Sequence, residues 1–297
     1  MVKIPIHIVT YSRRYLLIVV FLICYLMLVG PFSSYMQKKP IVEKVANIPS
    51  LKLLQFVSAD HQELVGSSLV MEVLLYFGGL MNQKQNIIKV SPDYPAMSRL
   101  SQAAVKCEPY NMDAYYFAQA IFVWDVGQVQ LANNLLAYGM KYRTWDWSLP
   151  FYAGFNYAYV LKDYEPAAVY YRKAAELSGN PLFVKLAGRY MHEAGQTELA
   201  IAYLTTMVKS ARNPAIKKTY ELRLAALNAV RTLEIARDNY LKEKGHPPSS
   251  LQVLVSSGYL PVIPEDPYGG TFYIDEDGSI NTTSKFAFKK AAEETQQ

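Results

Sequence analysis

The side chains best suited to catalysis are few in this sequence, and they do not cluster. The four histidines, His7, His61, His192 and His246, are scattered along 297 residues, and we expect His192 to be exposed. No Gly-x-Ser-x-Gly, P-loop, His-Glu-x-x-His or strand-linked Gly-x-Gly-x-x-Gly pattern occurs, so no nucleophile, phosphate or zinc site of those types is indicated. The sequence therefore predicts no catalytic residue, no cofactor and no enzymatic activity.

The cysteines and the one carboxylate in an apolar setting do not indicate a site either. Cys24 and Cys107 are far apart and belong to no Cys-x-x-Cys pair or Cys/His cluster, so structural zinc and haem attachment are not expected. Glu72 lies within an apolar run, and we interpret it as a helix-surface or capped residue. These residues predict no metal centre.

Tyrosine is the residue type that could serve recognition, with 24 copies in the chain. Most of the tyrosines at residues 152–171 should pack between helices. Because tyrosine is favoured at interfaces, Tyr152, Tyr157 and Tyr159 are candidate contacts with a protein partner. The net charge is only +5, and no basic run exceeds a pair, so nucleic-acid binding is not expected.

An apolar run at residues 15–32 could anchor the chain in a membrane. It has eighteen residues and no charge, which is close to the roughly 17–25 residues that a bilayer-spanning helix needs. Lys3, Arg13 and Arg14 precede it, and a basic flank favours the cytoplasmic side. The pattern predicts a cytoplasmic segment at residues 1–14 and one transmembrane helix at 15–32.

Two other export signals are alternatives to this anchor. A cleaved signal peptide would have a shorter apolar region and a small-x-small site, whereas here Pro31 directly follows Gly30, the plausible small residue. Residues 12–17 also resemble a twin-arginine export signal. A second apolar segment at residues 64–81 carries Glu72, so we expect a buried helix there, with residues 33–60 as the connection.

A sequence repeat occupies the middle of the chain. Three segments, beginning at residues 113, 148 and 181, align so that Ala132, Ala167 and Ala200 are equivalent. A period of roughly 34 residues is typical of a helix–turn–helix repeat, in which small residues recur where two helices cross closely. Gly188 would serve the first helix of the third repeat, and Gly195 would end it in a left-handed turn.

These segments resemble tetratricopeptide repeats, most closely in LAGRYMHEAGQTELAIAYL of the third copy. In the second copy, Lys162 stands where the family usually has glycine. The resemblance implies a helical solenoid at residues 61–213 that binds protein partners. Members that hold chaperone C-termini use Lys and Asn at positions that are apolar here: Phe117, Ile121, Ala153, Leu182 and Leu186. That function is therefore disfavoured.

The C-terminal part has a different pattern. Apolar residues at helical spacing predict a capping helix at residues 214–245, followed by a small α+β lobe at 246–288 and a loose tail at 289–297. Within the lobe, residues 271–274 and 279–283 flank an acidic turn, which predicts a β-hairpin.

This region resembles the C-terminal part of type II secretion pseudopilins and type IV pilins over a short stretch, although the processed pilin N-terminus is absent. The matching positions are Gly245, Pro248, Leu251, Leu254, Gly258, Tyr259, Leu260, Pro264, Asp266, Pro267, Tyr268, Gly269 and Tyr273. Some members bind calcium near the hairpin, which implies Asp275 and Asp277 as possible oxygen ligands. An acidic loop of this kind is more often a plain turn.

The sequence as a whole predicts a mainly α protein: a transmembrane helix, a tetratricopeptide-type solenoid and a small lobe with a hairpin. We expect a single-pass protein of a bacterial inner membrane, with its repeats in the periplasm. It would act as a scaffold or assembly factor in a cell-envelope, secretion or pilus-type system. A cytosol-facing membrane adaptor and an envelope hydrolase with an unrecognised site are the alternatives.

Overall fold

The computed structural model describes residues 6–38, 48–82, 87–88, 92–125 and 127–286, and it is mainly α, with helices in sequential packed pairs. Two compact units divide the chain, residues 1–117 and 118–297. The mainly α class and the C-terminal hairpin are confirmed. The expected loose tail at 289–297, and parts of the expected N-terminal segment, connection and lobe, lie outside the described residues.

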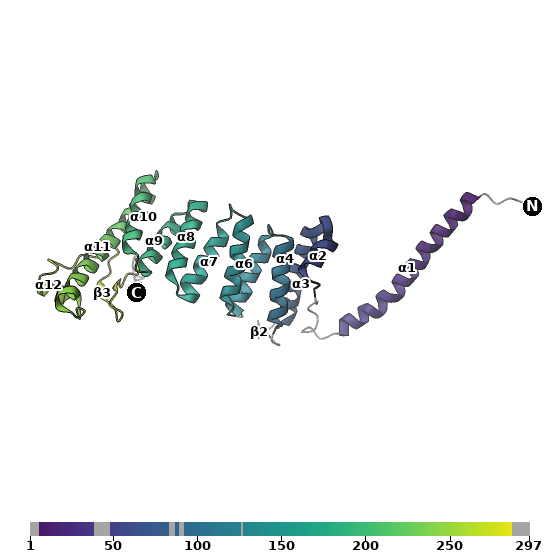
Figure 1. Cartoon of the computed structure of the whole chain (residues 1–297), viewed down its shortest axis with the longest axis horizontal. Helices are drawn as coiled ribbons and strands as arrows, with labels where there is room; N and C mark the ends of the chain where they lie inside the picture. The colour runs from purple at the N-terminus through teal and green to yellow at the C-terminus, as the bar shows by residue number, and fades with distance from the viewer. Residues whose placement is uncertain (1–5, 39–47, 83–86, 89–91, 126, 287–297) are drawn as a thin grey trace, which may run out of the picture. The chain divides into compact units, whose positions relative to one another are not determined.

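Helix α1 (Ile6–Lys38) contains the apolar run, and it extends past the expected end of the span at residue 32 (Figure 1). None of the apolar window at Tyr15–Lys38 is buried. Pro31 lies inside the helix, where it removes one backbone hydrogen bond. An exposed apolar helix at the N-terminus is consistent with a signal anchor or with a signal sequence.

Helices α2 (Leu51–Ser58) and α3 (Gln62–Leu80) follow, joined by the short helix η2 (Ala59–His61), so α2 falls within the expected connection. Helix α3 packs on α4 (Tyr94–Cys107). A Cβ atom added at Gly66 would come within 2.6 Å of the Glu108 Cβ, which shows how closely the two helices approach. Together α2 to α3 pass a length and composition test for a membrane span, but 39% of that window is buried.

Short strands and one further helix complete the first unit. Strands β1 (Met81–Asn82) and β2 (Ile87–Ile88) pair antiparallel, and no sequence pattern indicated them. The Asp93 side chain caps α4 by accepting a hydrogen bond from the Ala96 amide, as short acidic residues do at helix starts. Helix α5 (Met112–Ala120) spans the boundary between the units.

The second unit is a series of helices, each packed on the next. After the π-helical segment η3 (Ile121–Asp125) come α6 (Val129–Tyr142), α7 (Ser148–Phe155), the π-helical η4 (Asn156–Leu161), α8 (Tyr164–Ser178), α9 (Pro181–Glu193), α10 (Thr197–Ser210) and α11 (Pro214–Lys244). Asn180 and Asn213 cap α9 and α11, and each precedes a proline at the first helical position.

The sequence period is present in the backbone as well. Left-handed residues occur at Gly127, Lys162 and Gly195, with φ of 68°, 56° and 73°. Early in the helix after each turn lies an alanine with 0% exposure: Ala132, Ala167 and Ala200. A left-handed turn followed by a fully buried alanine therefore recurs three times. At Lys162 a non-glycine residue adopts the left-handed conformation that glycine tolerates best.

Two glycines show how closely neighbouring helices pack. At Gly188, an added Cβ would lie 3.1 Å from the Leu204 Cδ1, and at Gly154 it would lie 3.3 Å from the Tyr171 ring. Leu204 and Tyr171 are themselves buried. Tyr171 also stacks on Tyr190, with ring centroids 5.4 Å apart. The side chains of α8 and α10 thus fill space that α7 and α9 leave open.

The C-terminal lobe packs on α11. Helix α12 (Leu251–Ser256) is followed by strands β3 (Phe272–Ile274) and β4 (Ile280–Thr282), which pair antiparallel with Phe272 opposite Thr282. Leu254, Leu260 and Ile280 join one buried cluster with Val230 and Leu233 of α11. A hairpin alone is marginally stable in water, so this docking is what orders it.

Asp266 ties the turn before the hairpin to the strand after it. Its Oδ1 accepts a hydrogen bond from the Tyr268 amide at 2.9 Å. Its Oδ2 accepts hydrogen bonds from the hydroxyls of Thr282 and Ser284. An added Cβ at Gly270 would lie 2.5 Å from that same Oδ2, so only glycine fits there. The Asp-Pro-Tyr-Gly-Gly run is therefore joined to β4 and to Ser284 by hydrogen bonds and close packing.

Enlarging the alanines at the crossings should destabilise the fold. We expect Ala167→Leu and Ala200→Leu each to lower the free energy of unfolding by about 1–3 kcal/mol, because overpacking forces buried side chains and backbones apart. Urea unfolding of the full chain in detergent measures this. Ala202→Leu on the exposed face of α10 is the matched control. Equal stability of all three variants would contradict the described packing.

Candidate functional site

The three candidate tyrosines lie in different environments, and one of them offers an exposed ring. Tyr152 is half-buried against Phe151, and Tyr157 stacks on Tyr170 with ring centroids 5.6 Å apart. Tyr159 is 62% exposed and stacks on Phe155 at 5.0 Å. The structure therefore places Tyr157 mainly in helix packing and leaves Tyr159 available for contact.

Tyr159 borders a cleft of about 490 Å³, here named the tyrosine cleft. Segment η4 and helices α8 and α9 form one side of it, and the hairpin and the residues after it form the other. Its lining residues are Ala158, Tyr159, Lys162, Tyr164, Arg189, Tyr190, Glu193, Tyr273, Asn281, Thr282, Lys285 and Phe286. The Lys162 Nζ lies 5.2 Å from the centre of the Tyr159 ring, which holds a cation over that exposed aromatic face.

A second cleft of about 370 Å³, here named the basic cleft, shares Arg189, Lys285 and Phe286 with the first. It lies between α9, α11 and the end of the lobe. Its remaining lining residues are Leu182, Lys185, Leu186, Thr219, Leu222, Arg223 and Tyr268. Four of the described lining residues are cationic and none is acidic, so the lining of this cleft has an excess of positive charge.

Arg223 is the most unusual group in the basic cleft, because it is a cation with only 6% exposure. Its guanidinium lies 5.0 Å from the centre of the Tyr268 ring and 4.9 Å from that of Phe286. One nitrogen, Nη2, donates a hydrogen bond to the Phe286 carbonyl at 2.9 Å. Nε and Nη1 have no partner within the described residues. Burial lowers the pKa of Arg223 to about 10, so it stays charged at neutral pH.

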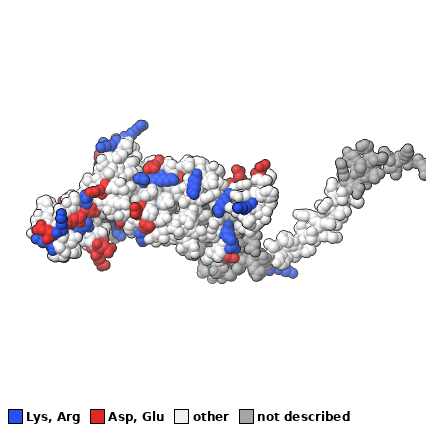
Figure 2. Space-filling view, viewed as in Figure 1, with Lys and Arg blue, Asp and Glu red and all other residues white. Residues whose placement is uncertain are grey.

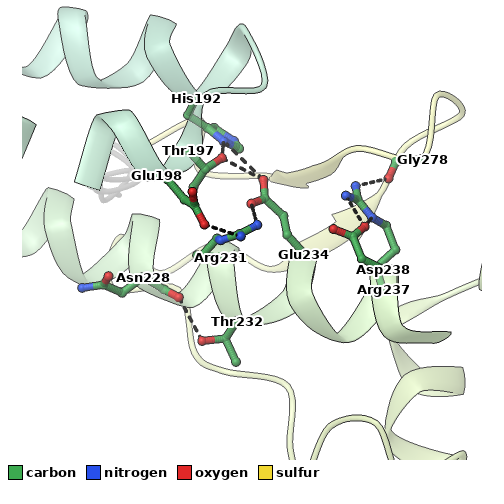
Figure 3. A network of polar contacts seen from close by, with 10 residues as sticks. All are labelled: His192, Thr197, Glu198, Asn228, Arg231, Thr232, Glu234, Arg237, Asp238 and Gly278. Carbon is green, nitrogen blue, oxygen red and sulfur yellow. Dashed lines mark hydrogen bonds and ion pairs between the residues drawn. The ribbon is translucent and has the colours of Figure 1, made fainter. Parts of the chain in front are cut away.

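His192 corrects one expectation from the sequence: it is buried, with 7% exposure, not exposed. The docked lobe covers it, with the Phe286 ring edge-on at 5.5 Å between centroids. Its Nδ1 lies 2.9 Å from the Thr197 hydroxyl oxygen, and that hydroxyl donates to Glu234 Oε1 at 2.8 Å (Figure 3). Helices α9, α10 and α11 each supply one member of this chain.

The same network continues to the surface. Arg231 bonds Glu198 of α10 and lies 3.5 Å from Glu234 Oε2 (Figure 3). Nearby, Arg237 donates a hydrogen bond to the Gly278 carbonyl at 2.7 Å, which holds the hairpin turn against α11. Arg231, Glu234 and Arg237 line a third cleft of about 510 Å³ that also borders Glu193, Asp238 and Asp275. The contacts join helices to one another and to the hairpin.

The possible calcium ligands form a turn in this structure. Asp275 Oδ1 accepts hydrogen bonds from the amides of Asp277 and Ser279, and Oδ2 accepts one from the Asn281 side chain at 2.6 Å. Within the described ranges, no group of three or more His, Cys, Asp or Glu side chains is placed to hold a metal ion. The geometry is that of an Asx-type turn. Calcium binding at Asp275 and Asp277 stays a prediction.

Charges on the rest of the surface are mixed. In Figure 2, lysines and arginines alternate with acidic residues over the helices in view and are separated by uncharged areas. No continuous basic stripe is visible among the described residues on that face. The excess of positive charge in the basic cleft therefore contrasts with the mixed charges on the face that Figure 2 shows.

Sequence reasoning missed the main members of the basic cleft. Arg223 is one base in a helix with alternating charge, and Lys285 lies far beyond it in the chain, after the hairpin. Only the docking of the lobe brings them together. A faint signal existed at Arg223, because it falls among apolar residues of the face that α11 buries.

Burial of His192 should make stability fall in mild acid. Burial lowers the pKa of its imidazole, and the Glu234 carboxylate opposes that shift. In the unfolded state the His192 imidazole has a pKa of about 6.5, so as the pH falls it is protonated before the folded state is. The free energy of unfolding therefore decreases as the pH falls below about 6.5. Between about pH 7.5 and pH 5.5, the Tm of His192→Asn should fall less than that of the wild type. His246→Asn, an exposed histidine, should behave like the wild type; an unchanged slope in His192→Asn would contradict the prediction.

No protein-family model matches the chain, and no curated protein matches it.

Proposed function

We propose that this chain is a membrane-anchored, tetratricopeptide-type scaffold that binds a protein partner at the tyrosine cleft. It would face the periplasm of a bacterial inner membrane and serve assembly in a cell-envelope, secretion or pilus-type system. The observation that carries the proposal is the cleft itself. Exposed aromatic rings and basic side chains line a hollow of about 490 Å³ between repeated helices and a docked hairpin.

The repeating backbone supports the tetratricopeptide assignment. A left-handed turn and a buried alanine recur at the sequence period, which is how a helix–turn–helix repeat maintains the same crossing in each copy. The residues that line the cleft are suited to binding a protein partner and not to catalysis. Tyrosine supplies large contact areas at low entropic cost, and basic side chains at its border supply orientation.

The exposed apolar helix α1 supports the membrane anchor, and the basic residues that precede the apolar run support a cytoplasmic N-terminus. The native thiols are poor reporters of this topology. Cys107 is 5% exposed, and burial raises its pKa, so it should react slowly. Cys24 lies in the apolar helix.

Topology can be measured with cysteines placed on either side of the span in a variant that lacks both native thiols. We expect Glu221→Cys, at an exposed position of α11, to react with a membrane-impermeant maleimide in intact spheroplasts. Ser12→Cys, before the span, should react only after lysis. The reverse pattern would favour the cytosol-facing adaptor. The mass of the purified chain separates an uncleaved anchor from a cleaved signal.

Partner binding at the tyrosine cleft can be tested in living cells with a photoreactive phenylalanine analogue. Placed at Tyr159, it should give a discrete protein adduct, because this ring is 62% exposed at the cleft. Placed at Leu241, which is 43% exposed on α11, it should give none. Adducts of equal yield at both positions, or at neither, would overturn the proposed binding site.

A further inference from the structure

We infer that the partner presents a segment carrying at least two carboxylates, which binds in the basic cleft beside the tyrosine cleft. This inference rests on the proposed function and specifies the chemistry of its ligand. The two clefts together are lined by five cationic side chains and one carboxylate, Glu193. Glu193 is already paired with Arg189 at 3.3 Å.

Several of these cationic side chains could form further ion pairs with an anionic ligand. Lys185 and Lys285 form no ion pair within the part of the chain that the structure describes. Arg223 is buried, and two of its nitrogens lack partners among the described residues. An unpaired buried charge is unfavourable, and a carboxylate in the adjoining cleft would offset part of that energy. Among the described residues, the cationic side chains of the two clefts therefore outnumber the carboxylates, which favours a negatively charged ligand.

The walls of the basic cleft favour a peptide. Leu182, Leu186 and Leu222 supply apolar surface beside the cations, so a ligand should carry apolar side chains between its charges. A polynucleotide would require a longer basic track, and the face shown in Figure 2 has none among the described residues. Two positions at which chaperone-binding repeats hold a carboxylate, Leu182 and Leu186, lie in this apolar wall, so the cations of this cleft come from other positions.

The test uses the full-length chain in nanodiscs and a fluorescent peptide, tetramethylrhodamine-Glu-Leu-Glu-Leu-Glu-Leu-amide. We expect binding that weakens with salt and falls by about tenfold or more in Lys185→Glu/Lys285→Glu. The same variant should gain binding of the matched lysine–leucine peptide, which loss of folding would not produce. Lys209→Glu/Lys217→Glu changes the net charge equally at exposed sites outside both clefts and should bind like the wild type.

Other outcomes would overturn the inference. Equal binding of the acidic and basic peptides, or equal weakening by both double variants, would show that the clefts do not select a carboxylate ligand. Direct binding of phosphatidylserine vesicles or inorganic phosphate, without binding of the acidic peptide, would assign the site to a phosphate group. If Tyr159 crosslinks a partner but Lys185→Glu/Lys285→Glu leaves that adduct unchanged, the scaffold function stands and this inference fails.

Discussion

Close approach between successive helices is the constraint on which the second unit depends. Two helices can pack closely only where at least one of them presents a small residue. Ala132, Ala167 and Ala200 are small residues of this kind, and none of them has exposed surface. The left-handed turns ahead of them set the angle at which each helix returns. A larger residue at a crossing would separate two helices and, through them, their neighbours, since each helix packs on the next.

The last helix of such a series has a face with no following repeat, and here the C-terminal lobe covers it. Apolar side chains of the lobe pack on α11, while polar contacts from Arg223 and Arg237 determine where the lobe sits. The lobe therefore has two roles. It completes the core, and it builds the three clefts at its edges, so the candidate binding surface exists only in the docked state.

The lobe covers two buried groups that differ in electrostatic character, and the Phe286 ring contacts both. At the first, His192, Thr197 and Glu234 form hydrogen bonds across three helices. At the second, Arg223 contacts two aromatic rings and forms one hydrogen bond to the backbone. A satisfied network contributes to stability, whereas an incompletely paired cation creates a field that a ligand can use.

The sequence alone determined the class of structure, because its periods are local. Spacing of apolar and small residues located the helices and the repeat at Ala132, Ala167 and Ala200, and the Gly, Pro and Asp pattern located the hairpin. Three features depended on tertiary structure: the burial of His192, the antiparallel pair β1–β2, and the union of Arg223 with Lys285. These arise from contacts that no local pattern encodes, and docking of the lobe decides two of them. Neither helical spacing nor composition carries information about which surface a distant lobe will cover.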